Sequence, residues 1–532
     1  MPRSVALPNR VRQGAAPPSA PARHPWLEAL GLAVVTVAVF WPTLSAELVY
    51  DSRMQILTDS FLFDPANWVP VLSFQTLALD VLDFNRPVNL ASLMLDATLW
   101  GRAPFGYHLT SVLLHALDVV LVWWLLRQLA PALPLAAGVV APLLFAVHPL
   151  VTEAVCEPSY REDILVALFT LTGLSLALGH RSAPGRPDVW RALGCIGCAL
   201  LAIGSKESGI AAPTVIAVAW LALRRDDCGA FWKLAGGGAA AVVLAFLAAR
   251  FVLEPNPSKI FEARPSYPGG SLAAALLIEP RILALYAQLV VLPVNLCADY
   301  GLHSLTHLPL PVALVIDAVA AIAGVVAIRA DRRFAIAATL VVVPLLSVAN
   351  LVPIYRPAAD RYLYLPVAGL ALAVGVTLDA PWLARRPRWR GHAARILAGL
   401  AVVLGAACIS RQTVWRDSLA LWTDTARKNP LSFTASAGSS EALREAGRLQ
   451  EAEAAARRAV ALTGGGFGDA WATLALIVAE RGRTDEAFAH LDRALEVNPK
   501  LADPDGRVAV KAMERPYADE LKRLLARRRA AP

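Results

Sequence analysis

A carboxylate stands at the end of the first long apolar run, where the sequence reads Leu48-Val49-Tyr50-Asp51-Ser52. An acid at the boundary of a membrane is partly removed from water, which suits it to act as a general base. The alternative is an ordinary interfacial aspartate, which is the commoner role for a single acid beside a membrane span. Asp51 is therefore a candidate base if other chemical groups gather around it.

A series of charged and histidine-containing motifs follows Asp51 along the chain. Arginine suits a phosphate diester because its planar guanidinium pairs with two oxygens at once. Each motif also has a structural interpretation: a histidine can hydrogen-bond inside a helix bundle, and an arginine can reach lipid head groups. Taken together, cations that converge beside one carboxylate are typical of a site for a lipid-linked phosphate and its acceptor. The candidate site residues are Asp51, Arg86, His108, His148, Glu153, Arg161, Asp163, Lys206, Glu207, Asp360 and Arg361.

Membrane-spanning helices are the elements that must position these residues. Hydrophobic residues make up 56% of the chain and charged residues 17%, a balance outside the range of soluble domains. The predicted fold class is all-α: a polytopic bundle of about 11 spans with a C-terminal α-solenoid. Spans are expected near residues 27–48, 109–128, 132–147, 163–179, 189–204, 209–223, 231–250, 308–328, 334–350, 362–380 and 394–410.

Arginine clusters in short loops set the predicted orientation, because such loops favour the cytoplasmic side. The basic tail 1–25 is assigned to the cytoplasm, as are the clusters at 181–191, 224–233, 329–333 and 385–395. A single crossing by residues 272–295 would export the cluster at 329–333, so that segment is interpreted as re-entrant or interfacial. The large loop 49–107 and every candidate site residue then share the external face.

The arginines of these short loops explain the net charge of +8, so the charge does not call for a nucleic-acid partner. The high alanine and arginine content and the compact loops favour a bacterial inner membrane, with the N-terminus cytoplasmic and the C-terminal region external. A membrane of the eukaryotic endoplasmic reticulum would obey the same topology.

The C-terminal region, residues 411–532, follows the membrane domain 26–410 and carries a tetratricopeptide pattern. Trp471, Leu474, Ala475, Val478, Ala487, Leu491, Ala494 and Pro499 fall at the spacing of that repeat. A second repeat precedes it, because the run from Gly447 to Ala452 echoes the run from Gly482 to Ala487. Trp415 to Pro430 is similar to a lone second helix, and Tyr517 to Arg529 to a basic capping helix.

Two or three repeats are near the minimum for stability, so this region is expected to lean on the membrane domain. Solenoid grooves bind peptides of many kinds. The repeats are therefore interpreted either as a generic interaction module or as the element that presents an acceptor polypeptide.

The order of these motifs resembles that of the transmembrane and tetratricopeptide repeat-containing O-mannosyltransferases and their bacterial relatives. The resemblance rests on Tyr50-Asp51, Arg86-Pro87, His108 to His115, His148-Pro149 to Asp163, Lys206-Glu207, Pro293 to Tyr300 and Arg361 to Pro366, followed by the repeats. It implies membership of the C-type glycosyltransferase superfamily, whose members take sugar from a polyprenyl-phosphate donor on the external or luminal face.

The resemblance also implies roles for individual residues. Asp51 would deprotonate a Ser or Thr hydroxyl, and direct displacement of the polyprenyl phosphate would invert the anomeric carbon. Arg161, Lys206 and Arg361 would hold the donor phosphate, with no cofactor and no obligatory metal. This sequence departs from the family at Ser52, where a second acid is usual, which puts activity or acceptor choice in question.

Two other functions stay open from the sequence. One is a related transferase that acts on an envelope lipid or polysaccharide. The other is a non-catalytic membrane scaffold that uses its repeats to recruit partners, and such a scaffold would tolerate replacement of Asp51.

Overall fold

The computed structural model describes residues 25–79, 81–179, 188–223, 229–253, 266–509 and 515–531. Over these ranges the chain forms helices and turns, with no strands, which confirms the predicted all-α class. The basic tail up to residue 24 lies outside them, as do four of the arginines used to predict the orientation: Arg181, Arg186, Arg224 and Arg225.

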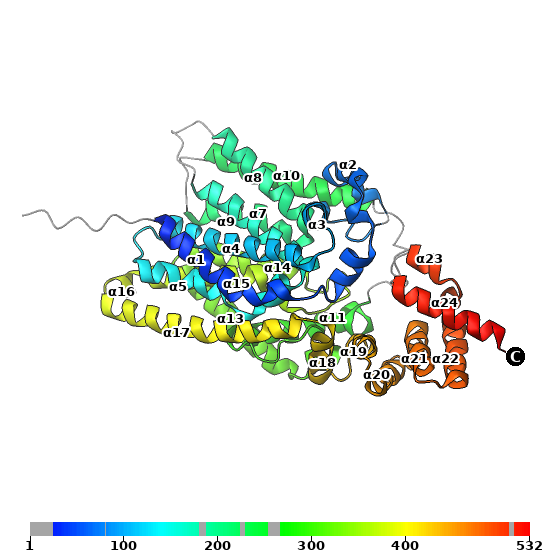
Figure 1. The fold of residues 1–532 in the computed structure, drawn as a ribbon. Helices are drawn as coiled ribbons and strands as arrows, with labels where there is room; N and C mark the ends of the chain where they lie inside the picture. The colour runs from blue at the N-terminus through cyan, green and yellow to red at the C-terminus, as the bar shows by residue number, and fades with distance from the viewer. Residues whose placement is uncertain are drawn as a thin grey trace, which may run out of the picture.

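Long apolar helices build the main body, as the spacing of apolar runs predicts (Figure 1). Among the described residues, six helical segments are long and apolar enough to cross a membrane. They are α4 (Pro104–Leu129), α10 (Gly229–Leu253), α11 (Leu272–Val291), α13 (Leu310–Ala330), α15 (Tyr364–Asp379) with its preceding turn, and α17 (Pro387–Gln412). The protein is therefore an integral, multi-pass membrane protein.

Shorter apolar helices complete the bundle. They are α1 (Pro25–Val39), α5 (Leu135–Ala146), α7 (Arg161–Leu178), α8 (Val189–Ser205), α9 (Ala211–Leu223) and α14 (Arg333–Ser347). Helix α7 packs against α4, α8 and α9, and α15 packs against α4, α5 and α14. The approach of α15 to α4 requires glycine at position 375, because a Cβ there would lie 2.4 Å from a methyl carbon of Leu126.

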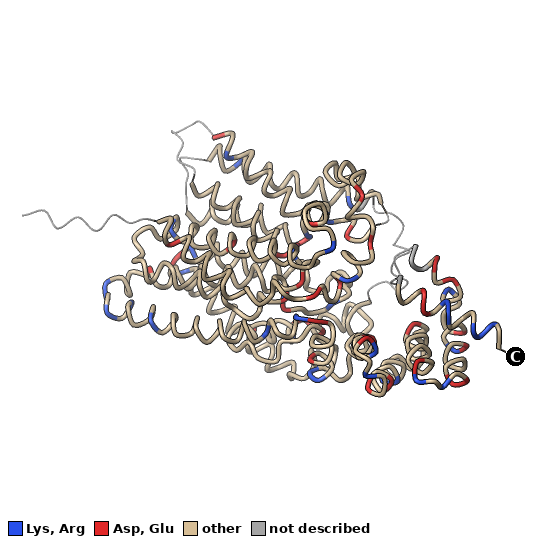
Figure 2. The backbone as a smooth tube through the Cα atoms, in the orientation of Figure 1, with Lys and Arg blue, Asp and Glu red and all other residues tan. Residues whose placement is uncertain are grey.

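Polar contacts mark the two ends of the bundle. At one end Arg333 donates to the carbonyl oxygen of Leu129 at 2.9 Å and to Asp379 at 2.6 Å, and Arg127 pairs with Glu28. These contacts tie the ends of α4, α14, α15 and α1 together. Charged residues gather at both ends of the bundle, and the helices between them are largely uncharged (Figure 2). The opposite end carries Asp51 and is called the site end below.

Helix α11 runs from Leu272 to Val291 with Pro280 inside it, and the re-entrant or interfacial interpretation of residues 272–295 stays a prediction. Its length and composition would allow it to span. Three contacts from the middle and the end of the helix join it to segments of the site end, as the interfacial alternative requires. Glu279 accepts from Asn350 at 3.0 Å, Arg281 donates to the carbonyl oxygen of Leu308 at 3.0 Å, and the carbonyl oxygen of Val290 lies 3.1 Å from His148.

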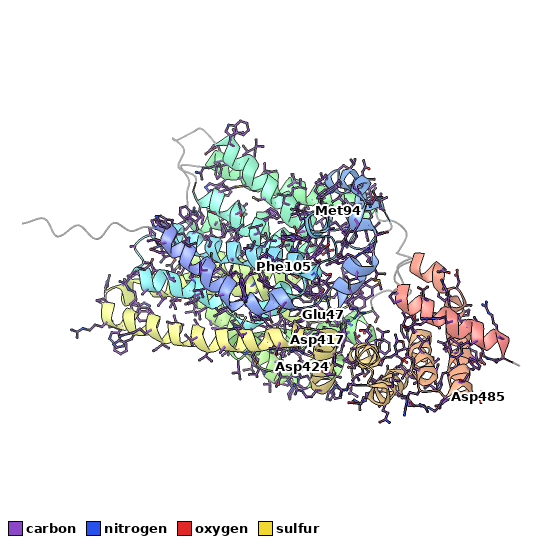
Figure 3. All side chains as sticks on the ribbon, viewed as in Figure 1. Glu47, Met94, Phe105, Asp417, Asp424 and Asp485 are labelled. Atoms are coloured by element: carbon purple, nitrogen blue, oxygen red, sulfur yellow. The ribbon has the colours of Figure 1, made fainter. Side chains whose placement is uncertain are left out.

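The large loop between α1 and α4 folds into short helices at the site end. It contains α2 (Trp68–Leu72) and α3 (Pro87–Trp100), and Met94 of α3 and Phe105 at the start of α4 are labelled in Figure 3. Leu62, Val71 and Met94 are buried together in a small apolar core of this loop. The loop is thus a packed structure rather than a mere connector.

Helical hairpins form the C-terminal region. They are α18 (Ser418–Lys428), α19 (Phe433–Glu445), α20 (Leu449–Leu462), α21 (Gly468–Glu480), α22 (Thr484–Val497), α23 (Pro504–Ala509) and α24 (Arg515–Ala530). The two hairpin turns contain Gly447 and Gly482 with φ of 72° and 80°, a backbone conformation that glycine adopts without strain. Leu521 and Leu525 of α24 pack against the core of α21 and α22. The assignment of these hairpins to the tetratricopeptide class stays a prediction.

The C-terminal helices rest on the site end of the bundle, which confirms that they lean on the membrane domain. Glu47 donates its backbone N–H to the carbonyl oxygen of Arg416 at 2.9 Å, and Glu47, Asp417 and Asp424 lie near one another at this junction in Figure 3. Asn429 donates to the carbonyl oxygen of Asp299 at 2.9 Å. The repeats and the candidate base therefore lie on the same side of the bundle.

Candidate active site

The chain turns sharply as it leaves α1 and the short helix η1 (Trp41–Ser45). Ser52 donates its backbone N–H to the carbonyl oxygen of Val49 at 3.1 Å. Tyr50 has a φ of 53°, a left-handed conformation that residues other than glycine adopt rarely. The turn leaves the Asp51 side chain exposed and encloses Ser52. The candidate base is thus presented to solvent at the site end.

Tyr160 connects Asp51 to a candidate phosphate-binding cation. Its hydroxyl donates to Oδ2 of Asp51 at 2.8 Å. Burial, reinforced by the charge of Asp51, raises the pKa of Tyr160, so the hydroxyl keeps its proton and remains a donor. The guanidinium carbon of Arg361 lies 3.8 Å from the centroid of the Tyr160 ring, within cation–π range. One side chain therefore joins the base and the cation.

Arg361 comes from the short helix η11 (Asp360–Leu363), which precedes α15. It forms an ion pair with Glu153 of α6 (Thr152–Cys156), and its backbone N–H donates to the same carboxylate at 3.0 Å. Its Nε atom has no hydrogen-bond partner among the described residues. The guanidinium is thus held in place by Glu153, with its Nε buried.

Lys206 lies at the break between α8 and the next short helix, η8 (Glu207–Ile210). Its ammonium pairs with Asp163 at 2.6 Å and with Glu162 at 3.0 Å. Burial lowers the pKa of Lys206, but these two carboxylates outweigh it and the net direction is upward, so the ammonium is charged. The ring of Tyr362 lies between the two cations, 5.1 Å from the ammonium and 5.1 Å from the Arg361 guanidinium.

A small cavity opens beside Lys206 and Tyr362. Its lining comes from α7, α14 and α15 as well as the α8 break, and consists of Asp163, Val166, Lys206, Ser208, Pro344, Val348, Tyr362 and Leu365. The lining mixes charged and apolar side chains, and the cavity volume of about 10 Å³ is close to that of a single water molecule.

Arg86 extends the same cluster. It forms an ion pair with Glu162, which also contacts Lys206, and lies 3.6 Å from Glu207. Asn85 donates to Glu207 at 2.7 Å. Predicted residues from five separate segments, at positions 51, 86, 153–163, 206–207 and 361, are thus brought together by contacts at the site end.

Arg161 is placed differently from the other two predicted phosphate ligands. Its side chain has no exposed surface and pairs with Asp96 at 2.6 Å. The guanidinium also donates to Ser111 at 3.2 Å and to the carbonyl oxygen of Tyr107 at 2.8 Å. These protein groups occupy the guanidinium, and the structure does not bring it to Lys206 and Arg361.

The predicted histidines and Asp360 lie inside the protein. His108 is buried in α4. His148 accepts from the backbone N–H of Leu150 at 3.3 Å and contacts α11 through its other nitrogen. Asp360 is buried and accepts from the hydroxyl of Tyr300 at 2.5 Å. These contacts suit residues that support the site rather than touch a substrate.

Sequence reasoning missed several members of the cluster. Tyr160, Glu162 and Tyr362 lie inside the motifs of the sequence analysis but are not among its candidate site residues. Arg356 was not singled out, yet it pairs with Asp299 at 2.5 Å and lies 5.4 Å from the centroid of the Tyr50 ring. The available signal was that aromatic residues adjoin the candidate cations at positions 160 and 362.

The fold and the contacts define a multi-pass membrane protein with an exposed carboxylate and a buried cluster of paired cations at one end of its bundle. Among curated proteins the chain is similar to protein O-mannosyl-transferases, which confirms the family resemblance drawn from the motifs. It is 26% identical over 310 residues to Protein O-mannosyl-transferase F38B6.6 of Caenorhabditis elegans, covering 55% of this chain and 42% of that protein. It is 35% identical over 204 residues to Protein O-mannosyl-transferase TMTC2 of Mus musculus, covering 36% of this chain and 22% of that protein.

The chain thus spans less than half the length of these curated relatives. No family model matches it. Among solved structures, ArnT from Cupriavidus metallidurans bound to undecaprenyl phosphate aligns over 94% of this chain and 78% of that chain, with 16% identity and a TM-score of 0.40.

Proposed function

We propose that this protein is a membrane glycosyltransferase that moves a sugar, mannose, from a polyprenyl-phosphate donor to Ser or Thr side chains of exported polypeptides. The relatives named as protein O-mannosyl-transferases support the reaction class. The observation that carries the proposal is Tyr160, which donates to Asp51 and lies under the guanidinium of Arg361. A base and a phosphate-binding cation are held one side chain apart.

In the proposed reaction, a carboxylate oxygen of Asp51 takes the proton of the acceptor hydroxyl. The hydroxyl oxygen bonds to the anomeric carbon while the bond from that carbon to the phosphate oxygen breaks. The polyprenyl phosphate leaves with the bonding electrons, and Arg361 and Lys206 stabilise its growing negative charge. A single displacement of this kind inverts the anomeric carbon.

No cofactor is needed in this proposal, because Arg361 and Lys206 supply the positive charge that a departing phosphate requires. Both are fixed by acids of the protein, Glu153 and Asp163. The lipid-linked sugar is a substrate, and its hydrocarbon chain would lie along the apolar helices beside the small cavity at Lys206.

The proposed orientation places the N-terminus in the cytoplasm and the site end with the repeats on the external face, in the inner membrane of a bacterium. The arginines of the short loops support this arrangement. Arg333 and the cluster at 385–395 lie at the end of the bundle opposite Asp51, as that rule requires.

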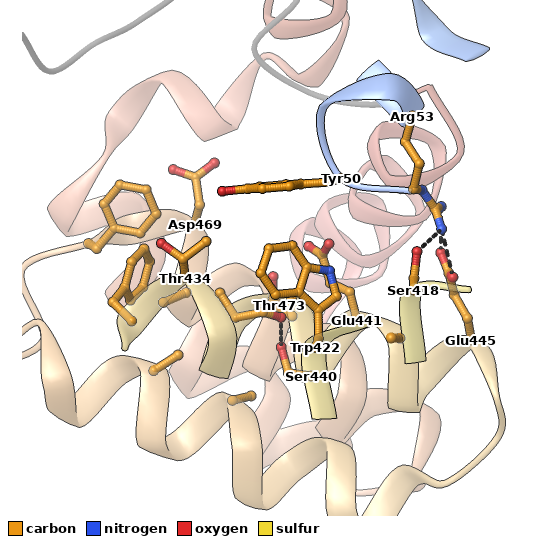
Figure 4. Close-up of a pocket in the computed structure, with 18 residues that line it drawn as sticks. Tyr50, Arg53, Ser418, Trp422, Thr434, Ser440, Glu441, Glu445, Asp469 and Thr473 are labelled. Carbon is orange, nitrogen blue, oxygen red and sulfur yellow. Dashed lines mark hydrogen bonds and ion pairs between the residues drawn. The ribbon is translucent and has the colours of Figure 1, made fainter. Parts of the chain in front are cut away.

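A groove between the base turn and the repeats is the proposed acceptor route (Figure 4). It has a volume of about 270 Å³ and is lined by Tyr50 and Arg53 of the turn and by residues of α18 to α21. Arg53 pairs with Glu445 at 2.8 Å across one end. Asp51 is not itself among the lining residues, but it follows Tyr50 directly, and the proposed route leads from the groove past Tyr50 to the base.

The lining of the groove suits an extended polypeptide. Aromatic rings lie on its walls: Tyr50 packs edge-to-face on Trp422, with centroids 4.9 Å apart, and Phe433 packs on Phe467 at 5.0 Å. Small residues lie between them, at Ala437, Gly438, Ala456, Ala459 and Ala470. Small side chains let a peptide backbone approach closely, and aromatic walls bind its side chains.

The test is transfer of radiolabel from polyprenyl-phosphate mannose to exported proteins, with purified wild type and Asp51→Asn in the same lipid. We expect labelled Ser or Thr with the wild type and none with the variant. Label in a lipid or polysaccharide fraction would move the acceptor to that class. Equal transfer by both proteins would remove Asp51 from the mechanism, and no transfer by either would favour the scaffold.

A further inference from the structure

Glu157 is a buried carboxylate that the proposed mechanism does not use. It follows α6 and precedes the short helix η7 (Pro158–Tyr160), and its side chain has 0% exposed surface. The other acids of this region each pair with a cation: Glu153 with Arg361, and Asp163 with Lys206. Among the residues that the structure describes, no lysine or arginine forms an ion pair with Glu157.

The partner of Glu157 is Ser52, the residue directly after the candidate base. Oε1 of Glu157 accepts from the backbone N–H of Ser52 at 2.8 Å and from its hydroxyl. The Ser52 hydroxyl oxygen in turn accepts from the backbone N–H of Ser159 at 3.1 Å. Ser52 also has 0% exposed surface. The turn that presents Asp51 is therefore fastened on its enclosed side by one carboxylate from a distant segment.

Burial of this carboxylate is costly. Burial raises the pKa of Glu157 well above its usual value, and the charge of Asp51 adds to that rise, while the Ser52 hydrogen bonds act against it. An alanine or glutamine would avoid most of the cost. The turn that Glu157 fastens contains the left-handed Tyr50, a conformation that persists only where surrounding contacts hold it.

We propose that Glu157 is the positioning residue of the candidate base, and that one acid is shared between positions 52 and 157. This inference rests on the proposed function of Asp51. It accounts for the serine at position 52: a second carboxylate there would be buried against Glu157, so the acid can occupy only one of the two positions. In this protein Glu157 supplies the second acid beside Asp51, and Ser52 donates hydrogen bonds to it.

The test exchanges the two side chains. We compare Ser52→Glu, Glu157→Ser and the double exchange Ser52→Glu/Glu157→Ser in the transfer assay. Each single variant should lose about tenfold or more in kcat. Ser52→Glu places two buried acids together, and Glu157→Ser removes the acceptor of the Ser52 hydrogen bonds. The double exchange should regain activity to within about threefold of the wild type. The KM for the donor should stay the same throughout, because Arg361 and Lys206 are unchanged.

A second measurement does not depend on catalysis. Hydrogen–deuterium exchange of the segment 49–53 should be faster in Glu157→Ser than in the wild type, because the Ser52 amide loses its side-chain acceptor. Glu496→Gln, at an exposed ion pair with Arg493 on α22, is the matched control. Unchanged exchange would overturn the positioning role even if the protein transfers no sugar. A double exchange no better than the single variants, in folded protein that binds donor normally, would overturn the shared acid.

Discussion

Tyr160→Phe separates the two contacts that Tyr160 makes. The substitution removes the hydrogen bond to Asp51, 2.8 Å long, and keeps the ring that lies 3.8 Å from the Arg361 guanidinium. A hydrogen bond to a charged group contributes about 1.5–3 kcal/mol. Asp51 is exposed, so water replaces part of this contact and the lower end of the range applies.

The expected loss is therefore about 1.5 kcal/mol, which is roughly tenfold in kcat. The KM for the donor should not change, because the cation–π contact is preserved. Tyr160→Leu serves as the matched variant: it removes the ring as well and should raise the donor KM in addition to lowering kcat.

The assay is steady-state transfer of labelled sugar to one acceptor peptide, with donor and acceptor varied in turn. The reasoning is refuted by a Tyr160→Phe protein with wild-type kcat. It is also refuted if Tyr160→Phe raises the donor KM as much as Tyr160→Leu, since the ring would then have no separate role.

Three further outcomes are expected. Arg361→Gln should raise the donor KM and destabilise the protein by about 3–5 kcal/mol, because Glu153 is left buried without its partner. The double variant Arg361→Gln/Glu153→Gln should lose less stability in thermal unfolding. Equal melting temperatures for the single and the double variant would contradict this reasoning. Ala437→Trp should fill the groove and raise the acceptor KM about tenfold with the donor KM unchanged. The control Ala454→Trp, on the exposed side of α20, should have no effect. Equal changes of the acceptor KM in both variants would show that the groove does not bind the acceptor. Addition of a chelator should leave the transfer rate unchanged, and a loss that Mg²⁺ or Mn²⁺ restores would show that Lys206 and Arg361 are not sufficient for the leaving phosphate.

The sequence predicted the membrane body well because the hydrophobic effect acts on long runs. Apolar segments of about 15 to 20 residues leave little choice but helices, whatever their neighbours. The cations at 206 and 361 could also be predicted, because a charge at the end of an apolar run must find a polar partner at that end of the bundle. The position of each cation at the end of an apolar run therefore predicts that Lys206 and Arg361 lie at the same end of the bundle.

Arg161 shows the limit of that argument. It has the same sequence context as Arg361, with an aromatic neighbour at the end of a span, yet it is enclosed by Asp96 and the backbone of α4. Asp96 is 65 positions earlier in the sequence, and only the packing of α3 on α4 and α7 brings the two together. The contact between Ser52 and Glu157 is hidden for the same reason. Pairings between distant segments depend on how helices pack, and a single sequence does not record that.

The cations of the site are already neutralised before any substrate arrives. Glu153 holds Arg361, and Glu162 with Asp163 holds Lys206. A phosphate that binds here must share these cations with carboxylates that cannot move into water, so electrostatic attraction alone gives it little net affinity. For the proposed lipid-linked donor, the remaining affinity would come from burial of the lipid chain, at about 0.8 kcal/mol for each methylene group. In the proposed reaction, the acids that orient the cations would therefore make the site selective. A free sugar phosphate would compete with them for the cations, whereas burial of a long hydrocarbon chain would offset that competition for a lipid-linked donor.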